Sequence, residues 1–312
     1  MYRLNEAILF KKSPRALKRG KAEEILKQVI EEDLFYYELT TSALVNLCDL
    51  LLIELRTTSA LEILDELKPY ITRLLEIAEK NRSYSLLAET YVLKARVALL
   101  TMDLKEARLF LTKAQKIAEK FGFKRLAIMI SNEHDELLKQ LRMWESLKES
   151  EAPLAERMEL ARLNEHMNQM LSKRAVEIPE LVNEEPILLL IMSKNGIPYF
   201  NYTFEESWDY SDLFSSFISA FNTFSSEIFS KSIDRIKIGE NIILINPIDS
   251  FLTCYVIKGQ SYPALQKLTR FSDLIKNNTE IWGTLKKAVK TCTMLELDKP
   301  PSLGAVVNEI FV

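Results

Sequence analysis

The feature that most constrains the fold is a motif that returns after 40 residues within a stretch of helical periodicity. The segment from Glu76 to Tyr91 (EIAEKNRSYSLLAETY) and the segment from Lys116 to Ser131 (KIAEKFGFKRLAIMIS) share Ile-Ala-Glu-Lys in the same register. Units of about 40 residues that recur are typical of helical arrays, in which each unit packs only on its neighbours. We therefore predict a helical repeat in the N-terminal half.

The apolar positions of this half follow the helical period. Residues of two successive segments recur at three- and four-residue steps, as one buried face of an α-helix requires. They are Leu87, Tyr91, Ala95, Ala98 and Leu99 in the first segment, and Leu104, Ala107, Leu111, Ala114, Ile117, Ala118 and Phe121 in the second. Asp103 lies between the segments and is a suitable N-cap for the second helix. A helix-turn-helix pair is expected over residues 84–122.

This helix pair resembles the tetratricopeptide repeat family. Ala95 matches the family's small residue in the first helix, and Ala107 matches the small position early in the second. Leu111 and Ala114 match the apolar and small positions that follow. Small residues let antiparallel helices approach closely. The resemblance is good over residues 84–122 and weaker elsewhere in the N-terminal half.

The tetratricopeptide resemblance implies a concave groove that binds a protein segment. First-helix positions and their equivalents 40 residues later would line it: Glu89, Val92, Arg96, Leu99, Met129, Asn132, Glu136 and Lys139. The alternative is that these residues form an ordinary solvated helix face. Both interpretations remain open at the level of sequence.

The periodicity changes near residue 175. VEIPELVNEEP holds two prolines and four glutamates and is typical of a linker. Beyond it, the sequence predicts five strands, each an apolar run that ends at a turn or break. The predicted turns are at Asn195-Gly196 and Gly239, and a break is predicted at Pro247. Helices are expected around Phe214–Ile228 and over 263–275 and 280–290, which gives the order β-β-α-β-β-β-α-α. The expected fold class is α+β and multidomain: a tetratricopeptide-like helical repeat over 1–175, a linker over 176–186, and an α+β domain with a five-stranded antiparallel sheet over 187–312.

This element order resembles the longin fold and, more distantly, the roadblock fold, over residues 186–292. The resemblance implies that the sheet and its central helix serve for dimerisation and for binding regulators, often small GTPases. In that helix the phenylalanines are expected in the core. The opposite, small polar side is a candidate interface with a second copy or a partner: Ser215, Ser216, Ser219 and Thr223.

The order of the two parts also resembles a group of archaeal proteins in which tetratricopeptide helices precede a longin-like domain. The stretches SLLAETYVLKARVALL, ISNEHDELLKQLRMWE and CYVIKGQSY carry this resemblance. It implies an architecture and names no activity.

The two histidines are the first candidates for chemistry, because each follows Asn-Glu. Glu133, His134 and Asp135 are consecutive, so on a helix their side chains point about 100° apart and do not converge. A zinc-binding helix places its ligands four residues apart, but Leu138 follows His134 at that step and Met170 follows His166. We interpret both imidazoles as structural or solvated. The seven glycines form no phosphate-binding loop, and the sequence predicts no catalytic residue, metal or cofactor.

Charge and cysteine content indicate which partners and which cellular compartment to expect. With 41 basic and 44 acidic residues the formal net charge is −3, which makes nucleic acid an unexpected partner. The one basic cluster is followed at once by glutamates; it comprises Lys11, Lys12, Arg15, Lys18, Arg19 and Lys21. Three distant cysteines suit a reducing compartment. Because no secretory signal and no membrane span is recognisable, a cytoplasmic location is expected.

Together these patterns suggest a non-catalytic adaptor or scaffold. Its repeat groove would bind a protein segment, and its longin-like domain would form a homodimer or bind a small GTPase or another regulator. The alternative is a sensory or regulatory module that binds a small ligand in the C-terminal domain.

Overall fold

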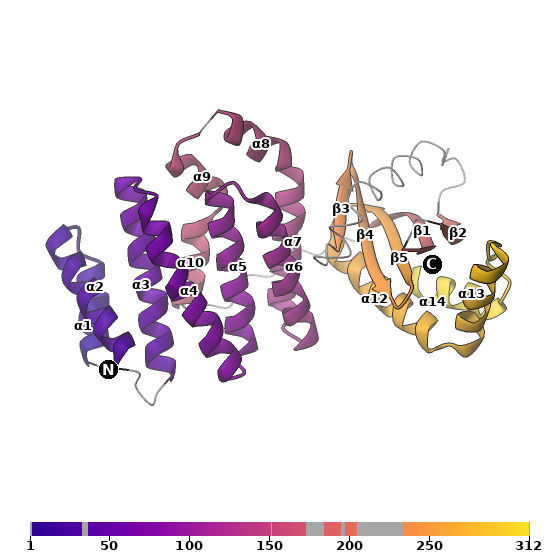
Figure 1. Cartoon of the computed structure of the whole chain (residues 1–312), viewed down its shortest axis with the longest axis horizontal. Coiled ribbons are helices and arrows are strands. Elements are labelled where there is room, and N and C mark those ends of the chain that lie inside the picture. Colours follow the sequence, from indigo (N-terminus) through magenta and orange to yellow (C-terminus); the bar gives the residue numbers. More distant parts are fainter. Residues whose placement is uncertain are drawn as a thin grey trace. The chain divides into compact units, whose positions relative to one another are not determined.

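The computed structural model describes residues 2–32, 37–150, 152–172, 184–194, 197–204 and 234–311. The chain divides into two compact units: unit 1 comprises Met1–Ile130 and Gln140–Ile178, and unit 2 comprises Ser131–Lys139 and Pro179–Val312. Ten helices precede a five-stranded antiparallel sheet, and helices follow it, in the described part of the chain (Figure 1). This confirms the predicted α+β class. The last nine residues of α7 group with the sheet, which differs from the predicted division at 176–186.

Unit 1 is built of helices that pack on their sequence neighbours. Each of α1 to α5 contacts the helix that follows it (Figure 1). The bounds are α1 Tyr2–Lys11, α2 Ala16–Glu31, α3 Tyr37–Thr58, α4 Glu62–Lys80, α5 Tyr84–Leu100, α6 Leu104–Lys120, α7 Lys124–Lys139, α8 Leu141–Glu149, α9 Leu154–Leu160 and α10 Leu163–Ser172. Packing between neighbours in sequence is the arrangement that a helical repeat predicts.

The turns after α4, α5 and α6 share one geometry. Each contains a residue with left-handed backbone angles: Arg82 (φ 53°), Met102 (φ 59°) and Gly122 (φ 74°). The next residue donates its N–H to the carbonyl of an alanine five positions earlier: Ser83 to Ala78 (2.8 Å), Asp103 to Ala98 (2.9 Å) and Phe123 to Ala118 (2.8 Å). Such bonds close the C-terminus of a helix. Because the turns recur every 20 residues, a helix pair takes 40, which accounts for the sequence repeat.

The pair α5–α6 confirms two local predictions. Asp103 is the N-cap of α6, since its Oδ1 accepts a hydrogen bond of 2.9 Å from the Glu106 N–H. Ala95 and Ala107 are buried, as close packing of the two helices requires.

Ala107→Leu is expected to lower the free energy of unfolding by about 1–3 kcal/mol. The position is fully buried, so added methylene groups force neighbouring side chains out of their preferred rotamers. Urea denaturation followed by circular dichroism measures the change. Lys116→Leu, at an exposed position of the same helix, is the control and should stay within about 0.5 kcal/mol of the wild type. Equal stability of the two variants would contradict close packing at Ala107.

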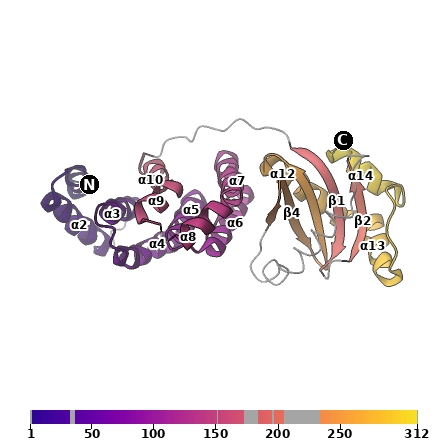
Figure 2. The ribbon, with the colours of Figure 1, turned by 90° about the horizontal axis from the view of Figure 1, so that it is seen from above.

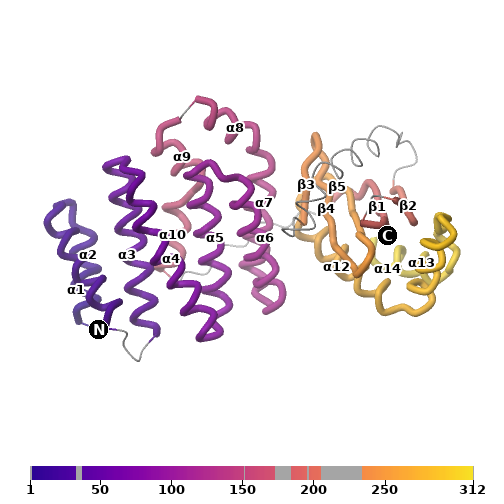
Figure 3. Tube along the Cα trace, in the orientation of Figure 1, coloured from indigo at the N-terminus to yellow at the C-terminus, as the bar shows by residue number. Residues whose placement is uncertain are grey.

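The last helices of unit 1 return along the array. Figure 3 follows the trace from α8 through α9 to α10, and α9 and α10 both contact α3 and α5. These contacts join residues more than 60 positions apart, such as Arg96 on α5 and Arg162 beside α10. This return was not predicted from the sequence.

Unit 2 contains the antiparallel sheet, with strand order β2-β1-β5-β4-β3. Its strands are β1 Glu185–Ser193, β2 Pro198–Thr203, β3 Arg235–Ile238, β4 Asn241–Ile248 and β5 Phe251–Lys258. The turn at Gly239 (φ 60°) is confirmed. The predicted break at Pro247 is wrong, because β4 continues through it and turns at Asp249 (φ 49°). A proline is tolerated there since it lies at the strand end, next to the turn.

Helices α12 (Ser261–Asn277), α13 (Thr279–Thr291) and α14 (Pro301–Phe311) follow the sheet (Figure 2). The first two confirm the predicted helical segments, whereas α14 was not predicted. They share one hydrophobic core with a face of the sheet, in which Tyr255 of β5 stacks edge-on against Phe311 of α14. Residues of the opposite face, such as Leu190 and Cys254, are buried as well.

Several predictions fall on parts of the chain that are not described. The Asn195-Gly196 turn, the helix around Phe214–Ile228 and the candidate interface residues Ser215, Ser216, Ser219 and Thr223 lie outside the described residues. Within the described ranges, no helix combines the length and the apolar character needed to cross a membrane.

Candidate functional site

Unit 1 contains a cavity of about 410 Å³ between α3, α5, α7 and α10. Its polar lining includes Glu38 and Asn46 from α3, Glu89 from α5, and His166 and Gln169 from α10. Its apolar lining comprises Val45, Leu86, Leu126, Met129, Met170 and Leu171. Binding sites for small molecules and for side chains of partners have this size and this mixture of surfaces.

Two of the predicted groove residues, Glu89 and Met129, line this cavity. Val92, Arg96 and Leu99, which continue along α5, are at most 7% exposed. Helices α9 and α10 pack on α5, and the Arg96 guanidinium donates a hydrogen bond to the Arg162 carbonyl between those two helices. Arg96 is therefore covered by the segment that joins α9 and α10.

The other three predicted groove residues lie in the part of α7 that belongs to unit 2. Asn132 is half-buried, and Glu136 forms an ion pair of 4.0 Å with Lys139. None of the three lines the cavity of unit 1. Of the eight predicted residues, two therefore line the cavity, three are buried along α5, and three belong to unit 2.

His166 forms part of the cavity wall and is buried. Its Nε2 lies 2.9 Å from the Glu89 carbonyl oxygen, so a neutral ring donates from Nε2 and leaves Nδ1 as an acceptor. Among the described residues, no hydrogen bond of ordinary geometry reaches Nδ1. Burial, and then the positive charge of Arg96, lower the pKa of His166 to about 3, against the opposing effects of the Glu89 carbonyl and Gln169. The ring is therefore neutral at physiological pH.

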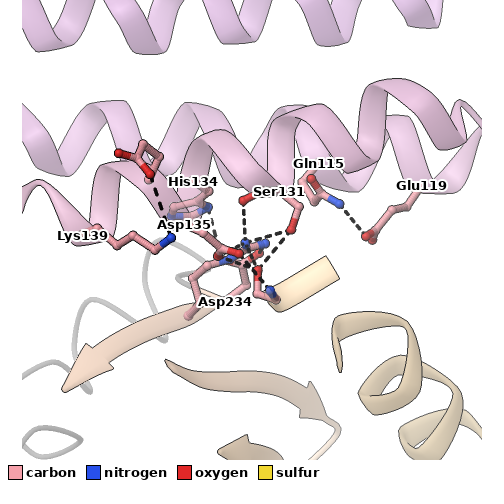
Figure 4. A network of polar contacts seen from close by, with 10 residues as sticks. Gln115, Glu119, Ser131, His134, Asp135, Lys139 and Asp234 are labelled. Atoms are coloured by element: carbon pink, nitrogen blue, oxygen red, sulfur yellow. Dashed lines mark hydrogen bonds and ion pairs between the residues drawn. The ribbon is translucent and has the colours of Figure 1, made fainter. Parts of the chain in front are cut away.

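A second polar cluster lies within unit 2, and Figure 4 labels its members Ser131, Asp135 and Asp234. These residues surround Arg235 of β3. The Arg235 side chain is 0% exposed. Its Nη1 lies 2.6 Å from Ser261 Oγ, 3.1 Å from Ser131 Oγ and 3.1 Å from Asp135 Oδ1. Its Nη2 lies 3.4 Å from Asp234 Oδ2. Burial disfavours the charge, but Asp234 and Asp135 outweigh burial and raise the pKa of Arg235.

Asp135 also fixes the start of α12. Its Oδ2 accepts a hydrogen bond of 2.8 Å from the Ser261 backbone N–H, and its Oδ1 accepts one of 2.5 Å from the Ser261 hydroxyl. A carboxylate is stabilised at a helix N-terminus by the unpaired N–H groups and the helix dipole. Asp135 thus balances the charge of Arg235 and caps a helix, which is a structural arrangement.

His134 and Lys11 are also buried. His134 is buried, and its Nδ1 lies 3.9 Å from Asp234 Oδ1. The Lys11 ammonium binds Asn46 Oδ1 (2.7 Å) and Asp49 Oδ2 (2.8 Å), so this member of the basic cluster is not exposed. The described residues bring no three histidine, cysteine or acidic side chains together as a metal site would.

The sequence pattern did not identify His166 as part of a cavity or Arg235 as the centre of a network. The partners of both residues lie far away in the sequence. His166 bonds Glu89, which is 77 positions earlier. Arg235 bonds Asp135 and Ser131, which are 100 and 104 positions earlier. No protein-family model, curated protein or solved structure matches this chain. Its function must therefore be argued from its own residues.

Proposed function

We propose that this chain is a non-catalytic interaction scaffold. Unit 1 is a tetratricopeptide-like repeat whose concave surface, formed by α3, α5 and α7, binds a protein segment. Unit 2 is a longin-like domain that forms a homodimer or binds a regulator such as a small GTPase. A cytoplasmic location accords with the three distant cysteines.

The observation that carries the proposal is the packing of α10 on α3 and α5 beside the cavity of about 410 Å³. A surface that holds an amphipathic helix through apolar contacts has the properties that helix-in-groove recognition requires. The 20-residue turn period and the small residues Ala95 and Ala107 support a tetratricopeptide-like repeat. For unit 2, support comes from the antiparallel order β2-β1-β5-β4-β3 followed by helices.

Met129→Glu is expected to reduce capture of the bound protein about tenfold, since a charge in the apolar part of the cavity costs a binding partner about 1.4 kcal/mol or more. The full chain is crosslinked in native lysate, and captured proteins are quantified by mass spectrometry. Lys116→Glu, at an exposed site of α6, is the matched control and should capture as much as the wild type.

Light scattering on the purified chain tests self-association. A monomer that captures no protein in a Met129-dependent manner would contradict the scaffold. If a thermal-shift screen then shows stabilisation by a metabolite, the chain is instead a small-ligand module, because only a specific ligand raises the melting temperature by mass action.

A further inference from the structure

The first two helices of unit 1 expose large apolar side chains. Among the residues that the structure describes, the three most exposed side chains of this kind are Tyr2 (81%), Leu17 (77%) and Leu9 (69%), all in α1 and α2. These helices pack on each other and on α3, at one end of the row of helices in unit 1 (Figure 1). The outer side of a terminal helix pair is normally polar, because no further repeat covers it. Large apolar residues that gather at such an end indicate an interaction surface.

The connection between α1 and α2 is strongly basic. Residues 12–21 (KSPRALKRGK) contain five cations and no acidic residue. The cations are Lys12, Arg15, Lys18, Arg19 and Lys21, and all are exposed except Arg19, which is half-buried. The preceding Lys11 binds Asn46 and Asp49 and is buried, so it does not belong to this group. The structure thus leaves five members of the basic cluster at the surface.

The cations and the leucines lie at the same end of this helix pair. Leu9 lies in the last turn of α1, and Leu17 lies in the first turn of α2. The Lys18 ammonium of α2 lies 6.0 Å from the centre of the Phe10 ring of α1, so the two helix ends are side by side. We call residues 9–21 the basic tip.

The nearby acidic residues do not cancel the charge of the basic tip. Glu6 and Glu24 flank the tip in sequence, so they offset at most two of its five cations. Glu23 instead forms an ion pair of 2.6 Å with Lys27. The basic tip therefore combines a net positive charge with two exposed leucines.

A second copy and a nucleic acid each match only part of this surface. In a symmetric dimer the same patch faces itself, so the five cations of one copy would meet those of the other. The phosphates of a nucleic acid attract the cations but offer no apolar region for the leucines. An anionic phospholipid surface matches both, because its headgroups attract lysine and arginine and its acyl boundary accepts apolar side chains.

We propose that the basic tip docks the chain on an anionic phospholipid surface. Leu9 and Leu17 enter the boundary between the headgroups and the acyl chains, while the cations remain at the level of the phosphates. The apolar stems of lysine and arginine allow their charged ends to reach this level. Binding is peripheral and reversible, since stable attachment takes more apolar surface than two leucines. The interaction goes beyond the scaffold function, because it brings the proteins held by the scaffold to a membrane.

Co-sedimentation of the full chain with large vesicles tests this proposal. Vesicles of phosphatidylcholine with about 30% phosphatidylserine should bind the wild type at least about tenfold more tightly than vesicles of phosphatidylcholine alone. Raising the salt from about 0.1 M to about 1 M should release the chain, because the Debye length falls from about 10 Å to about 3 Å. Equal binding to the two kinds of vesicle would overturn the proposal.

A pair of double variants isolates the charge. Lys18→Glu with Lys21→Glu is expected to weaken binding to the anionic vesicles at least about 30-fold, since each cation near such a surface contributes about fivefold. Lys116→Glu with Lys120→Glu, at exposed positions of α6, has the same net charge and should bind like the wild type. Equal weakening in the two double variants would show that net charge alone attracts the chain and would overturn a site at the basic tip.

A second pair isolates the apolar contact. Leu17→Ser is expected to weaken vesicle binding about tenfold, because it removes the apolar part of a side chain that enters the boundary. Leu61→Ser removes an exposed leucine (49%) outside the basic tip and should have no effect. All six substituted residues are exposed, so the variants are expected to fold, and circular dichroism checks this.

The same variants distinguish the other occupants. If a single-stranded DNA binds more tightly than the anionic vesicles, and Leu17→Ser leaves that affinity unchanged, the basic tip is a nucleic-acid site and the proposal fails. If Leu17→Ser dissociates a dimer in light scattering and the wild type does not sediment with vesicles, the tip joins two copies and the proposal also fails. Capture through Met129 tests the scaffold separately, so either function can fail without the other.

Discussion

Arg235→Met is expected to lower the free energy of unfolding of unit 2 by about 3–5 kcal/mol. The change leaves Asp135 and Asp234 buried without the cation that balances them, at 4% and 8% exposure. Ser261 also loses a hydrogen bond of 2.6 Å. Urea denaturation gives the free energy, and hydrogen exchange shows whether the first turn of α12 loses protection.

Arg270→Met is the matched control, because Arg270 lies in the same unit and pairs with Glu309 at the surface, where both side chains are more than half exposed. Exposed ion pairs contribute at most about 1 kcal/mol, so this variant should stay close to the wild type. Equal losses in the two variants would show that the Arg235 network does not stabilise unit 2.

The repeat could be predicted from sequence because its information is local. Ala78, Ala98 and Ala118 recur every 20 residues, and each accepts the bond that closes its own helix. Asp103 likewise caps the helix that begins at the next residue. Interactions within one or two helical turns produce a periodic residue pattern in the sequence. This pattern was sufficient to predict the helix pair and its small residues.

The candidate site could not be predicted in the same way, because its parts meet over long distances in the chain. The pattern of α10 shows an apolar face but does not say that this face covers α3 and α5. Arg235 stands in a short strand where a charged residue suggests exposure, yet Asp135, 100 positions earlier, makes its burial possible. Amphipathicity identifies a buried face, whereas the surface that buries it depends on tertiary packing.

The eight predicted groove residues illustrate what a helical register can and cannot predict. The register along α5 assigned Glu89 to the groove, and in the structure Glu89 lines the cavity. Helical geometry fixes which residues share a face. The same register could not reveal that α9 and α10 pack on α5, where Arg96 donates to the Arg162 carbonyl. Helices α9 and α10 lie outside the repeat, so the repeat pattern does not predict where they pack.

Acidification from pH 7 to pH 5 is expected to weaken the packing of α10 on α3 and α5. The pKa of His166 is about 3 in the packed state, against 6.5 for an ordinary histidine, so the packed state holds the neutral ring. Packing is therefore fully stable above about pH 6.5 and weakens as the pH falls from 6.5 toward 3, because the released helix takes up a proton. At pH 5, about 1.5 pH units below the ordinary pKa, the loss amounts to about 2 kcal/mol, or roughly 30-fold in the packing equilibrium.

Protection factors of the α10 amides at the two pH values measure this shift after correction for intrinsic exchange rates. The charged groups around the ring are Arg96 and Glu89 of α5 and Glu38 of α3, with Arg162 and Glu165 beside it in sequence. These groups are the same in the wild type and in a His166 variant, so comparing the two proteins isolates the effect of the imidazole. His166→Gln keeps a donor for the Glu89 carbonyl and cannot gain a proton, so its α10 should lose no protection at pH 5. His134 is present in both proteins, so its contribution cancels. If the glutamine variant loses protection as the wild type does, His166 does not control the packing of α10.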